Sequence, residues 1–148
     1  MLVPGSRDSA AAPDPVRTRL VAAGAAALTV GAGLGLRAVA AGSLGKYGGD
    51  ALYTVLLLAL VVLAAPRMTP LRAAGIALAA SWGIEFLQLS AVPAELSRHS
   101  AVARLVLGST FNAPDLFWYV AGAAAGWLVH TALSRRLRAA PGQVVRSA

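Results

Sequence analysis

The chain has 148 residues, of which 57% are hydrophobic and only 13% charged, and its formal net charge is +7. Soluble domains carry roughly 25% charged residues, so this composition predicts a one-domain integral membrane protein with no more than about four spans. The basic residues flank apolar runs rather than alternating with aromatic residues, which argues against nucleic-acid binding, and the lack of cysteine excludes disulfides, thiolate nucleophiles and cysteine metal sites.

Residues 1–17 are polar and proline-rich, so we expect a flexible N-terminal tail. The first transmembrane helix is predicted at residues 18–40, with Arg37 near its end. Within it, Gly31 and Gly35 either form a small-xxx-small helix contact or merely reflect an alanine- and glycine-rich composition. The segment also imitates a secretory signal with a cleavage site at residues 38–40, but its apolar run is long for a signal and the preceding arginine disfavours cleavage.

Residues 42–49 are predicted to form a short loop that carries Lys46, and Asp50 precedes a second span at residues 52–65 that stops at Pro66. A basic turn leads into a third span at residues 73–92. This span contains Glu85 and Gln88, which share a helix face because they are three residues apart. At 1.5 Å per residue, Glu85 would lie roughly 18 Å from one end of the span and about 10 Å from the other. An ionisable group at that depth is a functional-site candidate.

Residues 93–113 form the longest predicted loop, in which residues 102–108 are apolar but too short to cross a membrane. We expect an interfacial or re-entrant helix there. The segment Asn112-Ala-Pro114-Asp115 is typical of a helix start and opens a fourth span that continues to about residue 133. Its stripe of Asp115, Tyr119, Gly122 and Gly126 favours close helix packing.

The overall expectation is an all-α protein with four transmembrane helices, a flexible tail at 1–17, a transmembrane domain at 18–134 and a basic cytoplasmic tail at 135–148. Both termini are expected in the cytoplasm, because basic residues mark the inner side of a membrane protein. Nine of the 13 basic residues lie on that side: Arg7, Arg17, Arg19, Arg67, Arg72, Arg135, Arg136, Arg138 and Arg146.

This topology gathers polar residues at the outer end of the helices. The candidate binding residues are Arg37, Lys46, Asp50, Glu85, Gln88, Arg98, Asp115 and Tyr119. Three carboxylates balanced by cations could form a wet cavity for an amphiphile's head group, or an ion-pair lock that only holds the helices together. The aromatic residues nearby would also fit an ordinary interfacial belt.

The sequence identifies no catalytic nucleophile and no cofactor, and no metal site is predicted, because Asp50, Glu85, His99 and Asp115 match no ligand spacing. His130 is better explained as a packing residue than as a ligand.

The polar segments resemble a family of small bacterial integral membrane proteins catalogued as a domain of unknown function, and look related to the VanZ-like family associated with teicoplanin resistance. They are Gly35-Leu-Arg37, Lys46-Tyr-Gly-Gly-Asp50-Ala-Leu-Tyr53, Glu85-Phe-Leu-Gln88-Leu, Arg98-His, Leu107-Gly108-Ser-Thr-Phe111 and Asp115-Leu-Phe-Trp-Tyr119-Val-Ala-Gly122.

VanZ-like proteins share a pattern of Glu-x-x-Gln in one helix, an arginine in the following loop and an aspartate that opens a glycine-containing last helix. In this chain the pattern falls on Glu85, Gln88, Arg98, Asp115 and Gly122. Tyr119 stands where VanZ-like proteins tend to have asparagine, and the interval from arginine to aspartate is longer here. The resemblance implies a multi-pass protein of the bacterial plasma membrane that contacts glycopeptide or lipid-linked envelope chemistry, and it brings no established reaction.

The leading hypothesis is therefore a membrane protein that binds a polar or lipid-linked envelope molecule in an outer polar cavity. A second is an enzyme acting on a lipid head group, with Glu85 or Asp115 as acid/base and Arg98 holding an anionic group. A third is a small proton-linked transporter or scaffold. Four short spans form only a small conduit, so transport would require an oligomer.

Overall fold

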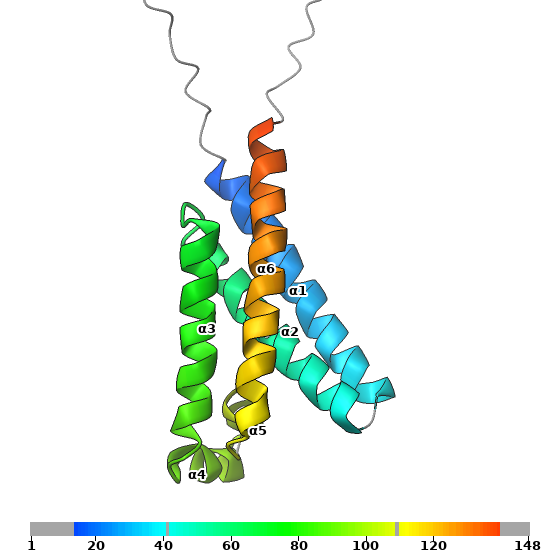
Figure 1. Ribbon diagram of the computed structural model, residues 1–148, viewed down its shortest axis with the longest axis vertical. Coiled ribbons are helices and arrows are strands. Elements are labelled where there is room, and N and C mark those ends of the chain that lie inside the picture. The colour runs from blue at the N-terminus through cyan, green and yellow to red at the C-terminus, as the bar shows by residue number, and fades with distance from the viewer. Residues whose placement is uncertain (1–13, 41, 109, 140–148) are drawn as a thin grey trace, which may run out of the picture.

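The computed structural model describes residues 14–40, 42–108 and 110–139. Of residues 138 and 139 it describes only the backbone. The tails predicted at residues 1–13 and 140–148 lie outside these ranges. The described residues form no strand, which confirms the all-helical prediction. They form six helices (Figure 1): α1 (Pro15–Val39), α2 (Gly42–Ala64), α3 (Pro70–Leu87), α4 (Val92–His99), α5 (Ala101–Leu107) and α6 (Ala113–Ala139).

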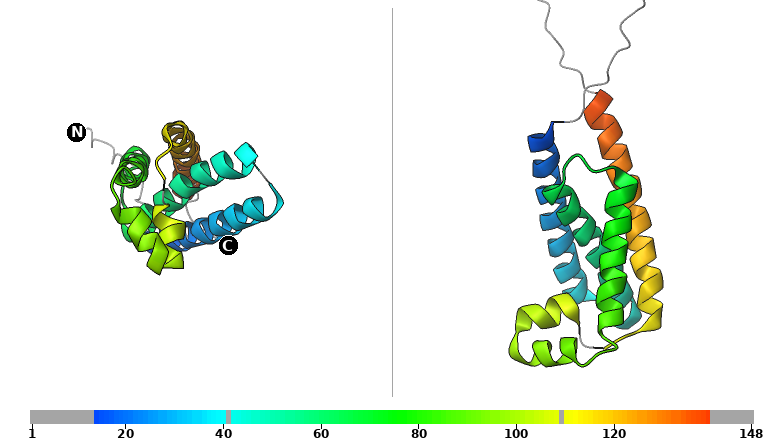
Figure 2. Two further views of the ribbon diagram at one scale, coloured as in Figure 1. Left: turned by 90° about the horizontal axis from the view of Figure 1, so that it is seen from below. Right: turned by 90° about the vertical axis from the view of Figure 1, so that its left-hand side faces the viewer.

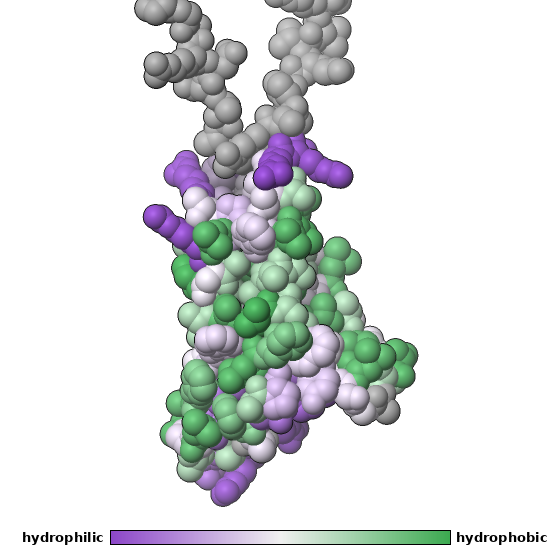
Figure 3. All heavy atoms as spheres, viewed as in Figure 1, coloured by the Kyte–Doolittle hydropathy of each residue, from purple (hydrophilic) through white to green (hydrophobic). Residues whose placement is uncertain are grey.

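Three of these helices have the length and hydropathy of membrane spans: α1, α2 and residues Ala113–Leu137 of α6. A fourth span is counted only if α3 and α4, which meet at a bend of 90°, are taken together. Figure 3 shows the most hydrophilic side chains at the two ends of the molecule and apolar side chains over much of the length between them. This distribution is consistent with a multi-pass membrane protein.

The helices α2, α3 and α6 pack against one another and form the centre of the bundle, and α1 pairs with α2 on its outside (Figures 1 and 2). The α2–α3 contact is made by small residues. Thr54 and Ser81 are fully buried and share a hydrogen bond of 2.9 Å, and Ala73 and Ala77 have no exposed surface. Small residues of this kind let helices approach closely, which is how membrane helices gain packing energy.

The glycine stripe of α6 faces α2. A Cβ atom built on Gly122 would lie 2.2 Å from the carbonyl oxygen of Ala51, and one on Gly126 would lie 2.8 Å from a methyl carbon of Leu58. The predicted close packing at these two glycines is therefore confirmed. In contrast, Gly31 and Gly35 of α1 have nothing within 4 Å of a built Cβ atom, so the small-xxx-small interpretation of α1 is wrong for the described residues.

The predicted loop at residues 42–49 is wrong, because α2 begins at Gly42 and these residues form its first two turns. Their glycines serve packing against the end of α1 rather than chain flexibility. A Cβ atom on Gly45 would lie 2.4 Å from the carbonyl oxygen of Ala40, and one on Gly48 would lie 2.6 Å from Leu36. The tight connection after α1 places Gly42 at a φ of 68°, a conformation that favours glycine.

Several helix boundaries also differ from the prediction. α1 begins at Pro15, inside the predicted tail, and α6 continues to Ala139, beyond the predicted stop at about residue 133. α3 ends at Leu87 rather than residue 92, and α4 begins with Pro93 in its first turn, where proline is tolerated. The predicted short helix at residues 102–108 is present as α5, capped by Ser100, whose hydroxyl accepts a hydrogen bond of 3.2 Å from the Ala103 amide.

We predict that Gly122→Ala lowers the free energy of unfolding by about 1–3 kcal/mol, because the new methyl group would collide with the α2 backbone. Thermal unfolding of the protein in a mild detergent measures this change. Gly75→Ala on α3 is the control: nothing lies within 4 Å of its built Cβ atom, and alanine favours a helix over glycine. Equal stability of the two variants would contradict the close α2–α6 contact.

Candidate functional site

A polar cavity of about 590 Å³ lies at the end of the bundle opposite the start of α1 and the end of α6. Its walls come from the second half of α1, the first half of α2, the last turn of α3, α5 and the first turns of α6. Its charged and amide-bearing lining residues are Arg37, Lys46, Asp50, Glu85, Gln88, Arg104 and Asp115. Its apolar lining includes Val30, Leu34, Leu52, Leu56, Leu105 and Val106.

Glu85 is the most deeply buried charged residue of this cavity, with 1% of its surface exposed. It does not lie deep within a helix as expected, because α3 ends two residues later, about 3 Å along the axis. Its burial comes instead from the segments that cover the end of α3. The Asn112 amide donates to its Oε1 atom at 2.6 Å, and the Tyr119 hydroxyl donates to its Oε2 atom at 3.0 Å.

The position of Asn112 explains how a carboxylate is stabilised here. Asn112 directly precedes α6, so the Glu85 carboxylate lies at the N-terminus of that helix. The N-terminus of a helix has free N–H groups and a partial positive charge, and both stabilise an anion. No lysine, arginine or histidine in the described ranges forms an ion pair with Glu85. A helix terminus and a phenol therefore stabilise Glu85, in place of the cation that an ion-pair lock would supply.

A second cluster joins α2 to α6 through one lysine and two aspartates. The Lys46 ammonium binds the Asp115 carboxylate and lies 3.7 Å from Oδ2 of Asp50. The Asn112 side-chain amide also donates to Asp115. The side chain of Asp115 is only 7% exposed, whereas that of Lys46 is 46% exposed. One cation therefore serves two carboxylates, and the buried one has a second donor, as a charge in low dielectric requires.

The short helix α5 closes the cavity and is held there by its carbonyl groups. Gln88 donates through Nε2 to the carbonyl oxygen of Leu107 at 2.6 Å, and the Tyr53 hydroxyl donates to that of Val106 at 3.0 Å. Gly108 follows with a φ of 64°, and a Cβ atom there would lie 2.7 Å from the Gln88 amide nitrogen. The Oε1 atom of Gln88 is buried and has no hydrogen-bond partner among the described residues.

Two arginines line the polar cavity without a protein partner. Arg37 comes from the last turn of α1 and Arg104 from α5, and neither makes an ion pair or hydrogen bond with a residue in the described ranges. Arg98 is different. All three arginines are exposed, but Arg98 lies on α4 outside the cavity lining and pairs with Glu95 at 3.0 Å.

Seven of the eight predicted site residues thus line one cavity, and Arg98 does not. Arg104 takes the place that Arg98 was expected to have. Both arginines lie in the predicted loop at residues 93–113, and the sequence pattern does not reveal the break at Ser100 that directs α4 and α5 differently. An enzyme of the expected kind would therefore hold its anionic group with Arg104 rather than Arg98.

The aromatic residues at this end mostly pack against other elements. Tyr47 stacks on Trp118 with ring centroids 5.5 Å apart, and Trp82 donates to the carbonyl oxygen of Leu116 at 3.2 Å. Of the aromatic residues expected near the site, Tyr119 lines the polar cavity. Within the described part of the chain, no three histidine or acidic side chains are grouped so as to hold a metal ion. His99 pairs with Glu95 on α4.

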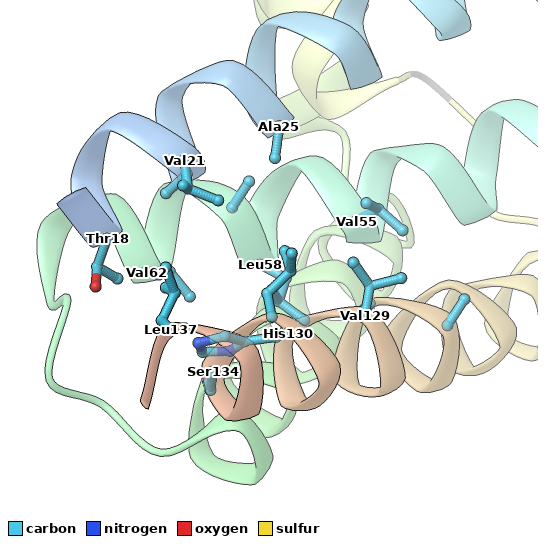
Figure 4. Close-up of a pocket in the computed structure, with 15 residues that line it drawn as sticks. Thr18, Val21, Ala25, Val55, Leu58, Val62, Val129, His130, Ser134 and Leu137 are labelled. Atoms are coloured by element: carbon cyan, nitrogen blue, oxygen red, sulfur yellow. The ribbon is translucent and has the colours of Figure 1, made fainter. Parts of the chain in front are cut away.

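A smaller cavity of about 160 Å³ lies near the start of α1 (Figure 4). Its walls are mainly valine, leucine and alanine side chains of α1, α2 and α6. His130 also lines it, and its Nδ1 atom has no hydrogen-bond partner among the residues described. This cavity contains no lysine, arginine or carboxylate, so the polar cavity is the stronger candidate site.

Residues 39–123 match a protein family of unknown function, DUF2809. The chain belongs to the DUF2809 family. The resemblance to a domain of unknown function is therefore confirmed, and the matched region contains α2 to α5 and the first turns of α6, with every charged residue of the polar cavity except Arg37. No curated protein and no solved structure matches the chain.

Removal of the Tyr119 hydroxyl should destabilise the protein. Tyr119→Phe leaves one oxygen of the buried Glu85 carboxylate without its donor, so the free energy of unfolding should fall by about 1–3 kcal/mol. Thermal unfolding in detergent measures the change. Tyr47→Phe is the matched control, because the Tyr47 ring stacks on Trp118 and its hydroxyl has no hydrogen bond with the described residues. A loss of the same size in both variants would contradict the role given to Tyr119.

A double-mutant cycle tests the ion pair between α2 and α6. Lys46→Met and Asp115→Asn should each destabilise the protein, and the double variant should lose less than the sum of both, because each single change leaves a charge unpaired. The exposed pair of Arg98 and Glu95 is the control, for which we expect little coupling. Additive effects at Lys46 and Asp115 would show that their contact does not stabilise the bundle.

Proposed function

We propose that this DUF2809 protein binds the polar head group of a lipid-linked envelope molecule in its polar cavity, in the plasma membrane of a bacterium. The observation that carries the proposal is the combination of charged and apolar walls in one cavity. A volume of about 590 Å³ falls within the usual range of small-molecule sites, roughly 300–1,000 Å³.

The apolar side of the cavity supports an amphiphilic ligand. Val30 and Leu34 of α1 line the cavity and remain 44% and 57% exposed, and Leu105 of α5 is 61% exposed. Val30 lies about 14 Å along the helix from Val39, within a segment long enough to cross a membrane. The cavity would therefore open toward hydrocarbon, where a lipid tail could remain while its head group enters.

The orientation belongs to the same proposal. The start of α1, the α2–α3 turn and the end of α6 lie at one end of the molecule (Figure 1). The described basic residues there are Arg17, Arg19, Arg67, Arg72, Arg135 and Arg136. By the positive-inside rule this end would face the cytoplasm, and the polar cavity would lie on the outer side of the membrane. An outer-side ligand agrees with the resemblance to VanZ-like proteins, which suggests a glycopeptide-type or lipid-linked envelope molecule.

Binding explains the geometry better than head-group catalysis. Both oxygens of the Glu85 carboxylate already accept hydrogen bonds from Asn112 and Tyr119, and Asp115 is engaged by Lys46. These contacts hold the carboxylates in place and satisfy them within the protein, whereas a general acid or base must reach the reacting atom of its substrate.

A matched pair of glycines on α1 tests the proposal. Gly33 lines the polar cavity and Gly24 lines neither cavity, and a Cβ atom built on either meets nothing within 4 Å. We expect Gly33→Phe to fill the cavity and to abolish the stabilisation that the polar lipid extract of the source membranes confers on purified protein. Gly24→Phe should retain it. Thermal unfolding measures the stabilisation, and native mass spectrometry identifies amphiphiles that remain bound.

One result would overturn the proposal. If wild-type protein retains no amphiphile, and the lipid extract stabilises wild type and Gly33→Phe equally, the polar cavity does not bind a lipid head group.

A further inference from the structure

The smaller, apolar cavity lies between α1 and α6, with α2 as its floor (Figure 4). It forms because α1 and α6 both pack on α2 but make little contact with each other. Side chains between them, such as Ala25 of α1 and Ala59 of α2, are too small to fill the space. Val21 and Val129 line the cavity from its two sides and are exposed, so this apolar cavity is a groove in the outer surface of the bundle.

The chemistry of the apolar cavity favours a hydrocarbon chain over water. Its volume is about 160 Å³, and none of its described lining residues is charged. An apolar cavity of roughly 150 Å³ in a soluble protein stays dry and takes up small apolar molecules. The lining residues Thr18 to Ala25 span about 10 Å of α1, a helix long enough to cross a membrane. The apolar cavity therefore fits a segment of a lipid acyl chain that lies along the helices.

Two arginines stand at the end of this cavity near the start of α1. Arg17 precedes the lining residue Val21 by four positions, and Arg136 follows the lining residue Leu133 by three. Helix residues three or four apart share a face, so both arginines lie on the faces that line the cavity. Each is within one turn of the end of its helix, where a membrane-spanning helix reaches the lipid head groups.

This end of the molecule is strongly positive. Asp14 is its one carboxylate among the described residues, whereas its described arginines are Arg17, Arg19, Arg67, Arg72, Arg135 and Arg136. All six arginines are exposed, so water can solvate each of them. Their combined positive potential nevertheless attracts anionic lipids to this end of the molecule, as basic clusters beside membrane-spanning helices do.

We propose that the apolar cavity binds an acyl chain of an anionic phospholipid, whose phosphate binds Arg17 and Arg136. Guanidinium groups suit the oxygens of a phosphate, because they offer several N–H donors in a fixed plane. By the positive-inside rule this end would face the cytoplasm, where the membrane surface is negative. The apolar and polar cavities share no lining residue, so this inference stands whatever ligand the polar cavity binds.

The experiment titrates the full-length protein in a neutral detergent with three probes. Dioleoyl phosphatidylglycerol is the anionic lipid, dioleoyl phosphatidylcholine has the same chains without net charge, and glycerol 3-phosphate has a phosphate without chains. Native mass spectrometry measures how much of each probe is bound. Phosphatidylglycerol should bind about tenfold more tightly than phosphatidylcholine or better, and glycerol 3-phosphate should show no measurable binding.

Neighbouring alanines of α6 test the acyl chain. Ala124 and Ala125 are both exposed, and of the two Ala125 lines the apolar cavity. Ala125→Phe should fill the cavity and weaken phosphatidylglycerol binding by about tenfold or more, because buried methylene groups are displaced. Ala124→Phe should leave the affinity unchanged. If Ala125→Phe does not fold, Ala25→Phe fills the same space from α1. Equal affinities of the filling variant and Ala124→Phe would overturn the proposal.

Two pairs of arginines test the head group. Arg17→Gln combined with Arg136→Gln should abolish the preference for phosphatidylglycerol over phosphatidylcholine. The matched control combines Arg67→Gln with Arg72→Gln, which removes the same charge from the same end of the molecule, and neither residue lines the apolar cavity. This control should retain the preference. An equal loss in both double variants would overturn the site, because it would show only the general positive potential of this end.

The remaining outcomes separate this site from the polar cavity. Gly33→Phe fills the polar cavity and should leave phosphatidylglycerol binding unchanged. If Gly33→Phe abolishes that binding, the lipid occupies the polar cavity and the inference is wrong. Equal affinity for phosphatidylglycerol and phosphatidylcholine would overturn the anionic head group. Glycerol 3-phosphate that binds as tightly as phosphatidylglycerol would overturn the acyl chain.

Discussion

The contact between the Glu85 carboxylate and the start of α6 is the constraint on which the polar end of this molecule depends. α3 ends two residues after Glu85, so the helix by itself would leave this charge close to its terminus. The Asn112 amide and the Tyr119 hydroxyl bind its two oxygens, and the helix terminus adds a partial positive charge. A buried carboxylate needs such partners, and this contact joins the start of α6 to the end of α3.

The other contacts of this end follow from that position. α6 then lies close enough to α2 for Gly122 to meet the Ala51 backbone and for Lys46 to reach Asp115. The segment between α3 and α6 folds back as α4 and α5, and Gln88 holds the end of α5 over the cavity. Protein groups bind the Glu85 and Asp115 carboxylates at the α3–α6 and α2–α6 contacts, whereas Arg37 of α1 and Arg104 of α5 are exposed and make no ion pair with the described residues. Structure and proposed binding are thus carried by different residues of one cluster.

Some residues of the polar cluster hold helices together, whereas others only line the cavity. This difference bears on whether the cluster is an ion-pair lock or a wet cavity. An ion-pair lock accounts for Lys46 with Asp115, and a buried hydrogen-bonded carboxylate accounts for Glu85. Neither involves Arg37 and Arg104, which line the cavity as exposed residues, or Oε1 of Gln88, which has no hydrogen-bond partner among the described residues. The cluster therefore combines a structural part near α6 with exposed arginines that line the polar cavity and take no part in the ion pairs.

The sequence by itself determined the membrane character, the all-helical class and the gathering of polar residues at one end. These follow from hydropathy, helix length and the alternating direction of successive helices, which are properties of single segments. Asn112-Ala-Pro114-Asp115 marked the start of α6 for the same local reason. Only the tertiary structure decided that Glu85 is bound by a helix terminus rather than by arginine, that Arg104 and not Arg98 lines the cavity, and that residues 42–49 are helical. Those outcomes depend on how helices rotate and pack against one another, which no single segment encodes.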